Sequence, residues 1–483
     1  MKIIMASSEL IPFAYSGDLG KNVRTLAVEL KNAGHDVSVV LPYYRSVAEG
    51  GFDVRPTEVE FQVNLGAKPT RAEILETKSA EGLQVFLVRR NEYFDRSAVY
   101  GDGRAYEDNS ERFIFFSKAA LELARRLSPT PEIIHSHDWT TALIPVLSKE
   151  RQLPFQTVLT IHDLMHQGSF WSFDFGLTNL PGHYFSANGV EFYGRLNLLK
   201  GGILSADAVV LPGEAALFEG FTPEGGYGLD AVLQENAGHV HGIPLGNDYA
   251  TTNPPLENLV GTGRAGDNLL ANKAAYRQAL TSRHGLEVSA EDSIVTIPIA
   301  PGDADVLTSI LPTIDLLLTN RLRLIVTGTI PTGSRAKTIV AGRRYPGKAA
   351  VVPASPGTED YALTLAGADL ALFPSSLGYR AQPLMAALRY GTIPVVRFRR
   401  GLTQLVTDVQ PAAQSGNGLV YYRNQPEAVL DALSRAHWLR QDRAAWQALL
   451  QRAGEVDFSW RQSAARYAAL YADLLRHRQA VPA

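Results

Sequence analysis

The sequence predicts an α/β protein with two doubly wound parallel sheets and a set of C-terminal helices. Three observations support this fold class. Short apolar runs alternate with segments of helical spacing in both halves of the chain, which is the pattern of parallel strands covered by helices. A stretch rich in Gly, Pro, Asn and Thr separates the two halves. After the second half, apolar residues recur at helical spacing almost to the end of the chain.

The first half begins with a β-α-β pattern. Residues 2–7 are apolar and predict a strand, residues 22–33 have helical spacing, and Gly34 precedes a second strand over 37–41. The same alternation then continues, with expected strands over 132–135, 157–161 and 208–211 and an expected helix over 140–151. Strands that alternate with helices in this way indicate a parallel sheet.

A linker is expected between the halves, and the α/β pattern restarts after it. The linker contains the run TTNPPLENLVGTGRAGDN, which lacks apolar periodicity. Beyond it we expect strands over 294–299, 322–327, 350–353 and 370–373 and helices over 306–318 and 382–390. We therefore divide the chain into an N-terminal domain over 1–245, a linker over 246–266, a C-terminal domain over 267–455 and a final helix over 456–483 that packs back on the first domain.

The composition argues against several classes of function. The 483 residues carry a formal net charge of -3, which gives no overall attraction to nucleic acid or to an anionic membrane. The absence of cysteine removes disulfides, thiolate nucleophiles and zinc-thiolate sites. The first residues make a poor signal peptide, and no apolar run is long enough to span a membrane. We expect a cytoplasmic protein with no metal or other cofactor and with neither nucleic acid nor membrane as a partner.

The turn after the first strand, FAYSGDLGKN over 13–22, lies where an α/β protein usually binds the phosphates of a nucleotide. It lacks the G-x-G-x-x-G spacing, and Asp18 would compete with a phosphate for the N–H groups at the start of the next helix. Capping of that helix is the simpler role for Asp18. A second glycine-bearing segment, GTIPTGSRAK over 328–337, lacks the lysine and hydroxyl of a P-loop and is interpreted as an ordinary loop.

Two further loops follow expected strands and carry histidines. HSHDWTTAL over 135–143 lacks enough ligands for a metal site, whereas an indole beside hydrogen-bonding side chains suits the apolar face and hydroxyls of a sugar. In TIHDLMHQG over 160–168, His162 directly follows a strand and is placed to face a cleft. A single histidine at a strand end is also often structural.

Several long segments, taken in order, resemble the bacterial glycogen synthase and plant starch synthase family. They are SSELIPFAYSGDLG, NEYFDRSAVYGDGRAYEDNSERFIFFSKAALEL, IIHSHDWTTALIPVL, TIHDLMHQGSF, GVEFYGRLNLLKGGILSADAVV, GYGLDAVL, LRYGTIPVVR and DFSWRQSAARYAALY. The resemblance covers nearly the whole chain. It implies a GT-B fold, with two Rossmann-like domains facing a cleft and the first similar to the starch synthase catalytic domain. It also implies a family whose members transfer glucose from ADP-glucose to the non-reducing end of an α-1,4-glucan.

The resemblance indicates that the donor diphosphate site has lost its cations. In the family motif K-x-G-G-L, this chain has Tyr15 at the lysine, keeps Gly17 and has Asp18 at the second glycine. In the family loop R-L-x-x-Q-K-G, the arginine and lysine align with Ile297 and Gly302. Because a leaving nucleoside diphosphate gains negative charge in the transition state, these changes predict impaired or lost glucosyl transfer.

Two more loops of the second domain depart from the family pattern. The glutamate of P-S-x-x-E-P-x-G-L, which serves the transferred sugar in the family, aligns with Gly378. The motif T-G-G-L is replaced by a segment that begins with Arg399 and Arg400. Together with Arg380, these arginines are able to return positive charge to a donor site from new directions, or they are part of a solvated face.

The residues that line the sugar and acceptor side of the family's site are largely kept. They are Tyr93, His137, Asp138, Trp139, His162 and Gln167, with His162 as the catalytic candidate if activity remains. This combination predicts a glycogen synthase-like protein of glycogen metabolism that binds α-1,4-glucan but has impaired or lost transfer from ADP-glucose.

Two other functions stay open from the sequence. The chain is an active glycogen synthase with ADP-glucose as its donor if the new arginines rebuild the site. It is a structural subunit if it pairs with an authentic glycogen synthase and never contacts sugar. Turnover of a nucleotide sugar separates the active enzyme from the other two, and binding to glycogen separates the glucan-binding protein from the structural subunit.

Overall fold

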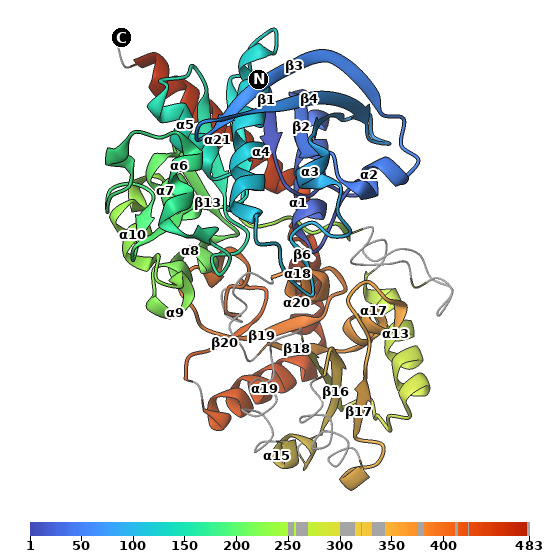
Figure 1. The fold of residues 1–483 in the computed structure, drawn as a ribbon. Coiled ribbons are helices and arrows are strands. Elements are labelled where there is room, and N and C mark those ends of the chain that lie inside the picture. Colours follow the sequence, from blue (N-terminus) through green and yellow to red (C-terminus); the bar gives the residue numbers. More distant parts are fainter. Residues whose placement is uncertain are drawn as a thin grey trace. The chain divides into compact units, whose positions relative to one another are not determined.

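The chain forms two compact units (Figure 1). Unit 1 consists of Met1–Leu245 and Trp460–Ala483, and unit 2 of Gly246–Ser459. The computed structural model describes residues 1–249, 256, 269–299, 314–319, 321–330, 343–373, 381–410, 414–423 and 425–480. Both units are α/β structures with parallel sheets, which confirms the predicted fold class.

Unit 1 contains a nine-stranded sheet in the order β14-β13-β9-β8-β1-β2-β5-β4-β3. The parallel strands are β1 (Lys2–Ala6), β2 (Asp36–Pro42), β5 (Gln84–Arg89), β8 (Ile133–His137), β9 (Gln156–Thr160), β13 (Ala208–Leu211) and β14 (Val240–Gly242). From β1 the chain proceeds through β2 to β5 on one side, and from β8 through β9 to β13 on the other. This is the strand order of doubly wound folds.

A hairpin at the outer edge of this sheet was not predicted from the sequence. Strands β3 (Arg55–Leu65) and β4 (Lys68–Lys78) pair antiparallel with each other, and β4 pairs antiparallel with β5. Along β3, polar residues such as Glu60 and Gln62 are exposed, while Phe61 and the apolar residues that follow it at every second position are buried. Charged side chains on an edge strand oppose pairing with another chain.

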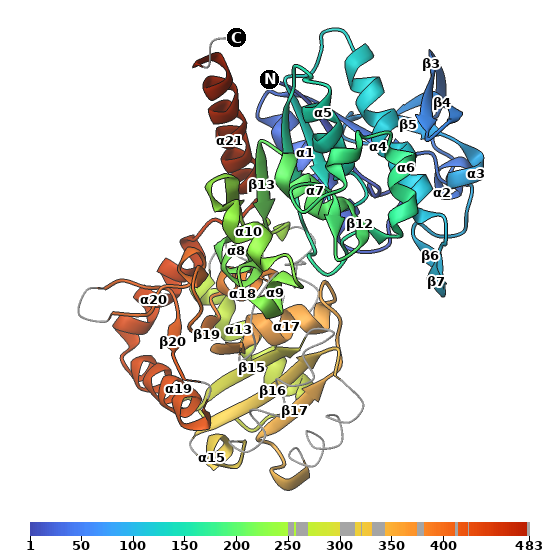
Figure 2. The ribbon, with the colours of Figure 1, turned by 60° about the vertical axis from the view of Figure 1, so that its left-hand side comes forward.

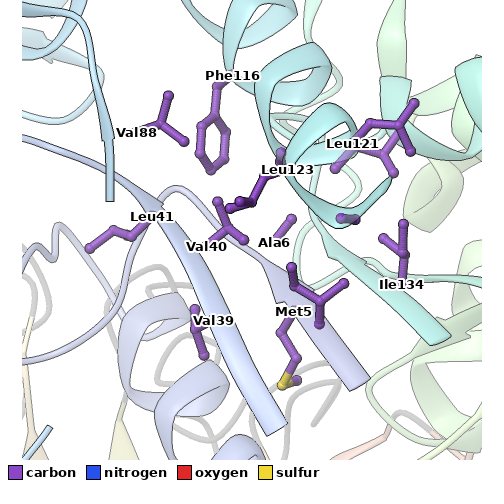
Figure 3. Packing of buried hydrophobic residues seen from close by; sticks show 14 of the residues in the cluster. Met5, Ala6, Val39, Val40, Leu41, Val88, Phe116, Leu121, Leu123 and Ile134 are labelled. Carbon is purple, nitrogen blue, oxygen red and sulfur yellow. The ribbon is translucent and has the colours of Figure 1, made fainter. Parts of the chain in front are cut away.

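Helices cover the unit 1 sheet and complete its core. They are α1 (Leu19–Asn32), α2 (Arg45–Glu49), α3 (Asn91–Phe94), α4 (Asn109–Arg126), α5 (Leu143–Glu150), α6 (Phe175–Thr178), α7 (Leu198–Ser205), α8 (Glu214–Gly220), α9 (Pro223–Gly226) and α10 (Asp230–Glu235). Figure 3 shows Phe116 and Leu123 of α4 packed near Val88 and Val40 of the strands. These two α4 residues are two helical turns apart, so they lie on the same apolar face of the helix, which packs on the sheet.

A small antiparallel sheet in the order β10-β12-β11 follows β9 in the chain. Its strands are β10 (Ser169–Phe170), β11 (Glu191–Phe192) and β12 (Arg195–Asn197), and the 3-10 turn η1 (Ser172–Asp174) follows β10. The remaining short elements of unit 1 are β6 (Gly101–Asp102), β7 (Arg104–Ala105), η2 (Gly182–Tyr184) and η3 (Ala237–His239). Strands of two or three residues carry no periodicity, and the sequence analysis did not predict them.

The C-terminal helix α21 (Trp460–Ala480) belongs to unit 1 and packs against α1 (Figure 1). Its Tyr467 and Tyr471 are buried. The Tyr467 hydroxyl lies 3.0 Å from Thr160 Oγ1, and the Tyr471 hydroxyl lies 2.8 Å from His135 Nδ1. The two tyrosines, one helical turn apart, thus join the end of the chain to strands β8 and β9.

Unit 2 contains a six-stranded parallel sheet in the order β17-β16-β15-β18-β19-β20 (Figure 2). Its strands are β15 (Ser293–Ile299), β16 (Leu322–Gly328), β17 (Ala349–Val352), β18 (Leu370–Phe373), β19 (Ile393–Arg397) and β20 (Leu419–Tyr421). Its described helical elements are α13 (Leu269–His284), α15 (Ile314–Thr319), α17 (Glu359–Gly367), α18 (Gln382–Arg389), η5 (Leu402–Gln404), α19 (Pro426–Gln441) and α20 (Arg443–Glu455). Most of the expected linker 246–266, and of the expected helix 306–318, lies outside the described residues.

The packing of α21 generates a prediction for stability. A Tyr471→Ala variant loses a buried ring and the partner of His135, so we expect the free energy of unfolding of unit 1 to fall by about 3–5 kcal/mol. Tyr471→Phe, which loses only the hydroxyl, should cost about 1 kcal/mol. Urea denaturation followed by circular dichroism measures both. The control is Arg466→Ala on the exposed face of α21, expected within about 0.5 kcal/mol of the wild type; an equal effect of Tyr471→Ala and the control would contradict the packing.

Candidate functional site

The candidate site lies at the carboxyl ends of β1, β8 and β9, which are adjacent in the unit 1 sheet. Because the chain builds the sheet outward from β1 on one side and from β8 on the other, the strand order reverses between these two strands. Doubly wound sheets bind their ligands at this switch point. Both histidine-bearing loops predicted from the sequence leave the sheet here, from β8 and β9.

Three histidines, called the histidine group, fill this edge of the sheet. They are His135 and His137 of β8 and His162, which lies just beyond β9. The rings of His135 and His137 pack with centroids 4.1 Å apart, and His137 Nδ1 lies 3.2 Å from His162 Nε2. His135 is held from the other side, with Nε2 2.7 Å from Thr160 Oγ1 and Nδ1 bonded to Tyr471 on α21.

The histidine group is electrically neutral at pH 7. Burial lowers the pKa of His135 to about 3 and that of His162 to about 4, and it lowers the pKa of His137 well below its ordinary value. Among the described residues, His137 Nε2 and His162 Nδ1 have no hydrogen-bond partner. Since one ring donates to the other, one of these two atoms carries a proton and the other a lone pair. Both atoms are buried, and an uncharged donor and acceptor give no attraction to an anion.

Asp138 links the two loops. Its backbone adopts a left-handed conformation with φ 57°, and its Oδ1 accepts a 2.6 Å hydrogen bond from the backbone N–H of His162. Burial raises the pKa of the Asp138 carboxyl to about 7, while the bond from His162 opposes that rise. The carboxyl therefore holds the backbone of His162 in place. Asp138 does so from a left-handed backbone conformation that most residue types avoid.

Trp139 stands beside the histidine group, on an aromatic support. Its indole is half-buried, lies 4.9 Å from the Phe113 ring in an edge-on arrangement, and lies 5.7 Å from the Phe170 ring. Gly168 approaches it so closely that a Cβ there would lie 2.6 Å from the indole Cε3, and its φ of 62° also favours glycine. The indole is thus fixed in place by its neighbours, with part of its surface left exposed.

Two other predicted sugar-binding residues, Gln167 and Tyr93, form hydrogen bonds with other residues of unit 1. The Gln167 amide donates to the backbone oxygens of Leu164 and Tyr227, and its oxygen accepts from Asn197. Tyr93 is buried, and its hydroxyl donates to Glu111, which together with burial raises the pKa of the phenol. Tyr93 packs in a separate aromatic cluster with Phe94 and Phe115. The group around His162 therefore consists of His137, Asp138 and Trp139, and roles for Tyr93 and Gln167 in ligand binding stay predictions.

The turn between β1 and α1 contains the predicted phosphate-site residues. Tyr15 is 67% exposed, and Asp18 lies at the N-cap position of α1. Asp18 makes no capping hydrogen bond with its side chain, so the predicted capping role was wrong. The reason is its helical backbone conformation, with φ -82° and ψ -13°, since a capping side chain needs an extended residue at this position.

Glu9, which the sequence analysis did not select, organises this turn. Its buried carboxylate accepts hydrogen bonds from the backbone N–H groups of Ser16, at 2.7 Å, and Gly17, at 3.2 Å. Its other oxygen accepts from the Tyr100 hydroxyl at 2.7 Å. Glu9 is the single acid of the opening segment MKIIMASSEL, and this is the signal that could have identified it, because a buried carboxylate is rare.

Some of the unit 2 residues predicted to lie at the sugar-nucleotide site are described by the structure, and others are not. Ile297 is fully buried within β15, in the apolar core of unit 2. Arg399 and Arg400 follow β19, while Gly302, Gly378 and Arg380 lie outside the described residues. In the parts of the chain that the structure describes, no group of three His, Asp or Glu residues could hold a metal ion, and no helix is long and apolar enough to cross a membrane.

A family model, curated relatives and solved structures all point to the same family and fold for this chain. A family model described as the starch synthase catalytic domain matches residues 2–235. The chain is 35% identical to a glycogen synthase of Geotalea daltonii and 33% identical to glycogen synthase 2 of Geobacter metallireducens, with 98% of each chain covered in both cases. Among solved structures, it is similar to the catalytic domain of starch synthase IV from Arabidopsis thaliana bound to ADP and acarbose, with a TM-score of 0.77, 24% identity and coverage of 98% of this chain and 99% of that one. The fold is that of the GT-B glycosyltransferases.

The neutrality of the histidine group generates a prediction for pH dependence. The folded pKa of His135, about 3, lies below its ordinary value of 6.5, so the unfolded chain binds a proton that the folded chain does not. The stabilisation is present above pH 6.5 and is lost as the pH falls. Between pH 7.5 and pH 5 this residue should lower the free energy of unfolding by about 2 kcal/mol.

Urea denaturation at the two pH values tests this sign. A His135→Gln variant should lose about 2 kcal/mol of the pH dependence, whatever its absolute stability. The matched control, His183→Gln, replaces an exposed histidine of unit 1 and should keep the full dependence. Equal pH dependence in both variants would contradict a neutral, buried His135.

Proposed function

The chain belongs to the glycogen and starch synthase family of glycosyltransferases, and on this premise we propose that it binds α-1,4-glucan while its transfer of glucose from ADP-glucose is impaired or lost. The proposal makes it a glucan-binding member of glycogen metabolism. The observation that carries it is the loss of positive charge at positions that align with the family's diphosphate-binding residues.

The positions that align with the family's diphosphate-binding cations carry neutral residues in this chain. Departure of a nucleoside diphosphate develops about two negative charges, and in an enzyme without a metal, fixed cations are the main means of stabilising them. Tyr15 offers an exposed, neutral phenol at the position of a lysine, and Ile297 offers an alkyl group buried in the core at the position of an arginine. At roughly 10²- to 10³-fold for each lost contact, transfer by the family mechanism should be reduced by several orders of magnitude.

The backbone of the first turn does not replace the missing cations. A diphosphate at the start of α1 would need N–H donors, and those of Ser16 and Gly17 already bond to the Glu9 carboxylate. Asp18 adds a second negative charge at the same turn. Two carboxylates near a phosphate disfavour its binding, since like charges at close range repel. This supports the loss of sugar-nucleotide binding. It argues against the view that backbone N–H groups have replaced the missing cations.

The proposed glucan side has groups whose chemistry suits a neutral sugar. His137 and His162 carry one unpaired donor and one unpaired acceptor, both buried at the edge of the sheet, and Trp139 has part of its indole exposed. Sugars bind proteins through hydroxyl hydrogen bonds and through contacts of their apolar faces with aromatic rings. The solved starch synthase IV, which carries ADP and acarbose, supports the view that this fold can hold a sugar ligand.

One observation favours the alternative of an active synthase with a rebuilt donor site. Arg397 and Arg399 lie near enough to the Tyr421 phenol to oppose the rise of its pKa. Arg397 is the last residue of β19, and Arg399 and Arg400 follow it at the carboxyl edge of the unit 2 sheet, where doubly wound folds bind ligands. A further alternative is a structural role beside an authentic glycogen synthase, without contact to sugar. For its location we propose the cytoplasm.

The loss of cations generates a prediction for turnover. On mixing the purified protein with glycogen and ADP-glucose, we expect no release of nucleoside diphosphate above background, and the same with UDP-glucose. The glycogen synthase of Geotalea daltonii serves as the positive control in the same assay. Release that a Trp139→Ala, His162→Ala double variant abolishes would contradict the proposal and would establish a rebuilt donor site.

The retained sugar side generates a prediction for binding. We expect the wild-type protein to be retarded in a native gel that contains glycogen, and the Trp139→Ala, His162→Ala variant to bind roughly tenfold more weakly. The matched control is Trp438→Ala, which removes an exposed tryptophan of unit 2 and should leave retardation unchanged. Absence of retardation in the wild type would contradict a glucan-binding function and favour the structural subunit.

A further inference from the structure

Lys200 is buried in unit 1, and we propose that it is a positioning residue for the candidate site, which holds the Trp139 indole in place without touching a ligand. It lies on the first turn of α7 and is 3% exposed. A lysine is rarely buried to this extent unless its ammonium has partners, so the groups that it binds show what it supports. The inference rests on the proposed function, because it concerns the ring that is proposed to contact glucan.

Three backbone carbonyls surround the Lys200 ammonium. Its Nζ donates to the oxygens of Ala187 at 2.5 Å, Gly189 at 3.1 Å and Glu191 at 2.6 Å. These three bonds use every donor of an ammonium, and an apolar side chain of the same length would supply none of them. The ammonium therefore fixes the segment that leads into β11, whose first residue is Glu191.

The same turn of α7 is bonded to the loop that follows β9. Asn197 caps the helix, with its Oδ1 accepting from the backbone N–H of Lys200 at 2.9 Å, and its Nδ2 donates to Gln167 Oε1 at 2.8 Å. The backbone N–H of Leu198 donates to the Gly168 carbonyl at 3.1 Å. The first turn of α7 therefore holds two segments, one through the Lys200 side chain and the other through its cap.

The small sheet provides a second route from Lys200 to the indole. Glu191, whose carbonyl accepts from the ammonium, pairs with Leu196 of β12. On its other side, Leu196 pairs with Phe170 of β10. The Phe170 ring lies 5.7 Å from the Trp139 ring. One residue from each strand therefore stands between the ammonium and the indole.

Both routes end at the indole of Trp139. Gly168 has a φ of 62°, and a Cβ there would lie 2.6 Å from the indole Cε3, so the backbone and the ring are already in contact. Phe170, two residues further along, is the other neighbour from this loop. Interiors packed this closely transmit small displacements, so a shift at the start of α7 or in β10 moves the indole relative to His162.

A purely structural role for Lys200 makes a different prediction. A buried charge that only stabilises unit 1 would weaken the whole unit when removed, and its effect on ligand affinity would add to that of any change at Trp139. A positioning role acts through the indole, so the effect of altering Lys200 on affinity should disappear once the ring is gone. Residues that share partners show this non-additivity, whereas independent residues do not.

Fluorescence of the full-length protein tests the position of the ring without any ligand. The variant is Lys200→Met, which keeps the approximate length of the side chain and removes the ammonium. The Trp139 signal is taken as the difference between each protein and its Trp139→Phe form, because the chain has five tryptophans. We expect acrylamide to quench this signal about twofold more strongly in Lys200→Met, since the half-buried indole loses its supports.

The matched control is Val85→Ala, which truncates a buried residue of β5, a strand separated from β8 by β1 and β2. It destabilises the unit by opening a cavity and should leave the Trp139 signal unchanged. A second variant, Asn197→Ser, keeps a capping hydroxyl for α7 and loses the bond to Gln167. It should raise quenching in the same direction as Lys200→Met, and it carries the test if Lys200→Met does not fold.

Native gels of graded glycogen content test the consequence for binding. We expect Lys200→Met to bind glycogen about threefold more weakly than the wild type, because a displaced ring forfeits part of an aromatic contact. In a Trp139→Ala background the same substitution should cause no further loss. An equal loss in both backgrounds would assign Lys200 a purely structural role and overturn the proposal.

The two measurements separate this inference from the proposed function. If the wild type is not retarded by glycogen, the proposed function is overturned, and the quenching data alone decide whether Lys200 positions the indole. If the wild type binds glycogen and the Trp139 signal is the same in the wild type, Lys200→Met and Asn197→Ser, the positioning role is overturned and the proposed function stands. An increase in quenching that Val85→Ala reproduces would overturn it as well, since it would reflect a general loosening of unit 1.

Discussion

The buried, neutral histidine group is the constraint on which the ligand edge of unit 1 depends. His135 is held between Thr160 and Tyr471, so the last helix of the chain helps to fix a ring in the centre of the first sheet. That ring packs on His137, which bonds to His162, and Asp138 holds the backbone beyond β9. Charging any of these rings would place an unsolvated cation in the sheet, so the edge is limited to neutral hydrogen bonding.

The loops after β8 and β9 differ in chemistry from the turn after β1. The loops after β8 and β9 offer uncharged donors, acceptors and an indole, which suit hydroxyls and the apolar face of a sugar. The turn after β1 offers two carboxylates, Glu9 and Asp18, and an exposed phenol, which do not suit a diphosphate. The proposed function follows from this contrast: the unit would hold a glucan and disfavour a sugar nucleotide.

Local patterns allowed the fold class and the histidine loops to be predicted, because strand and helix periodicities depend on nearby residues. The hairpin β3–β4 was not predicted, although charged and apolar residues alternate along β3, and the strands of the small sheet are too short to show a period. The contacts of Tyr471 with His135 and of Glu9 with Tyr100 join distant parts of the sequence, so only the fold reveals them. The capping role assigned to Asp18 failed because its backbone adopts a helical conformation, which propensity does not specify, and its side chain makes no capping hydrogen bond.

Isothermal titration of one preparation with maltoheptaose and, separately, with ADP-glucose tests the central claim most directly. The account predicts heat of binding and a saturable isotherm for the oligosaccharide, and no measurable binding of ADP-glucose under the same conditions. Saturable binding of ADP-glucose, lost in an Arg399→Ala, Arg400→Ala variant, would contradict the account, because it would show that positive charge has returned to a working donor site.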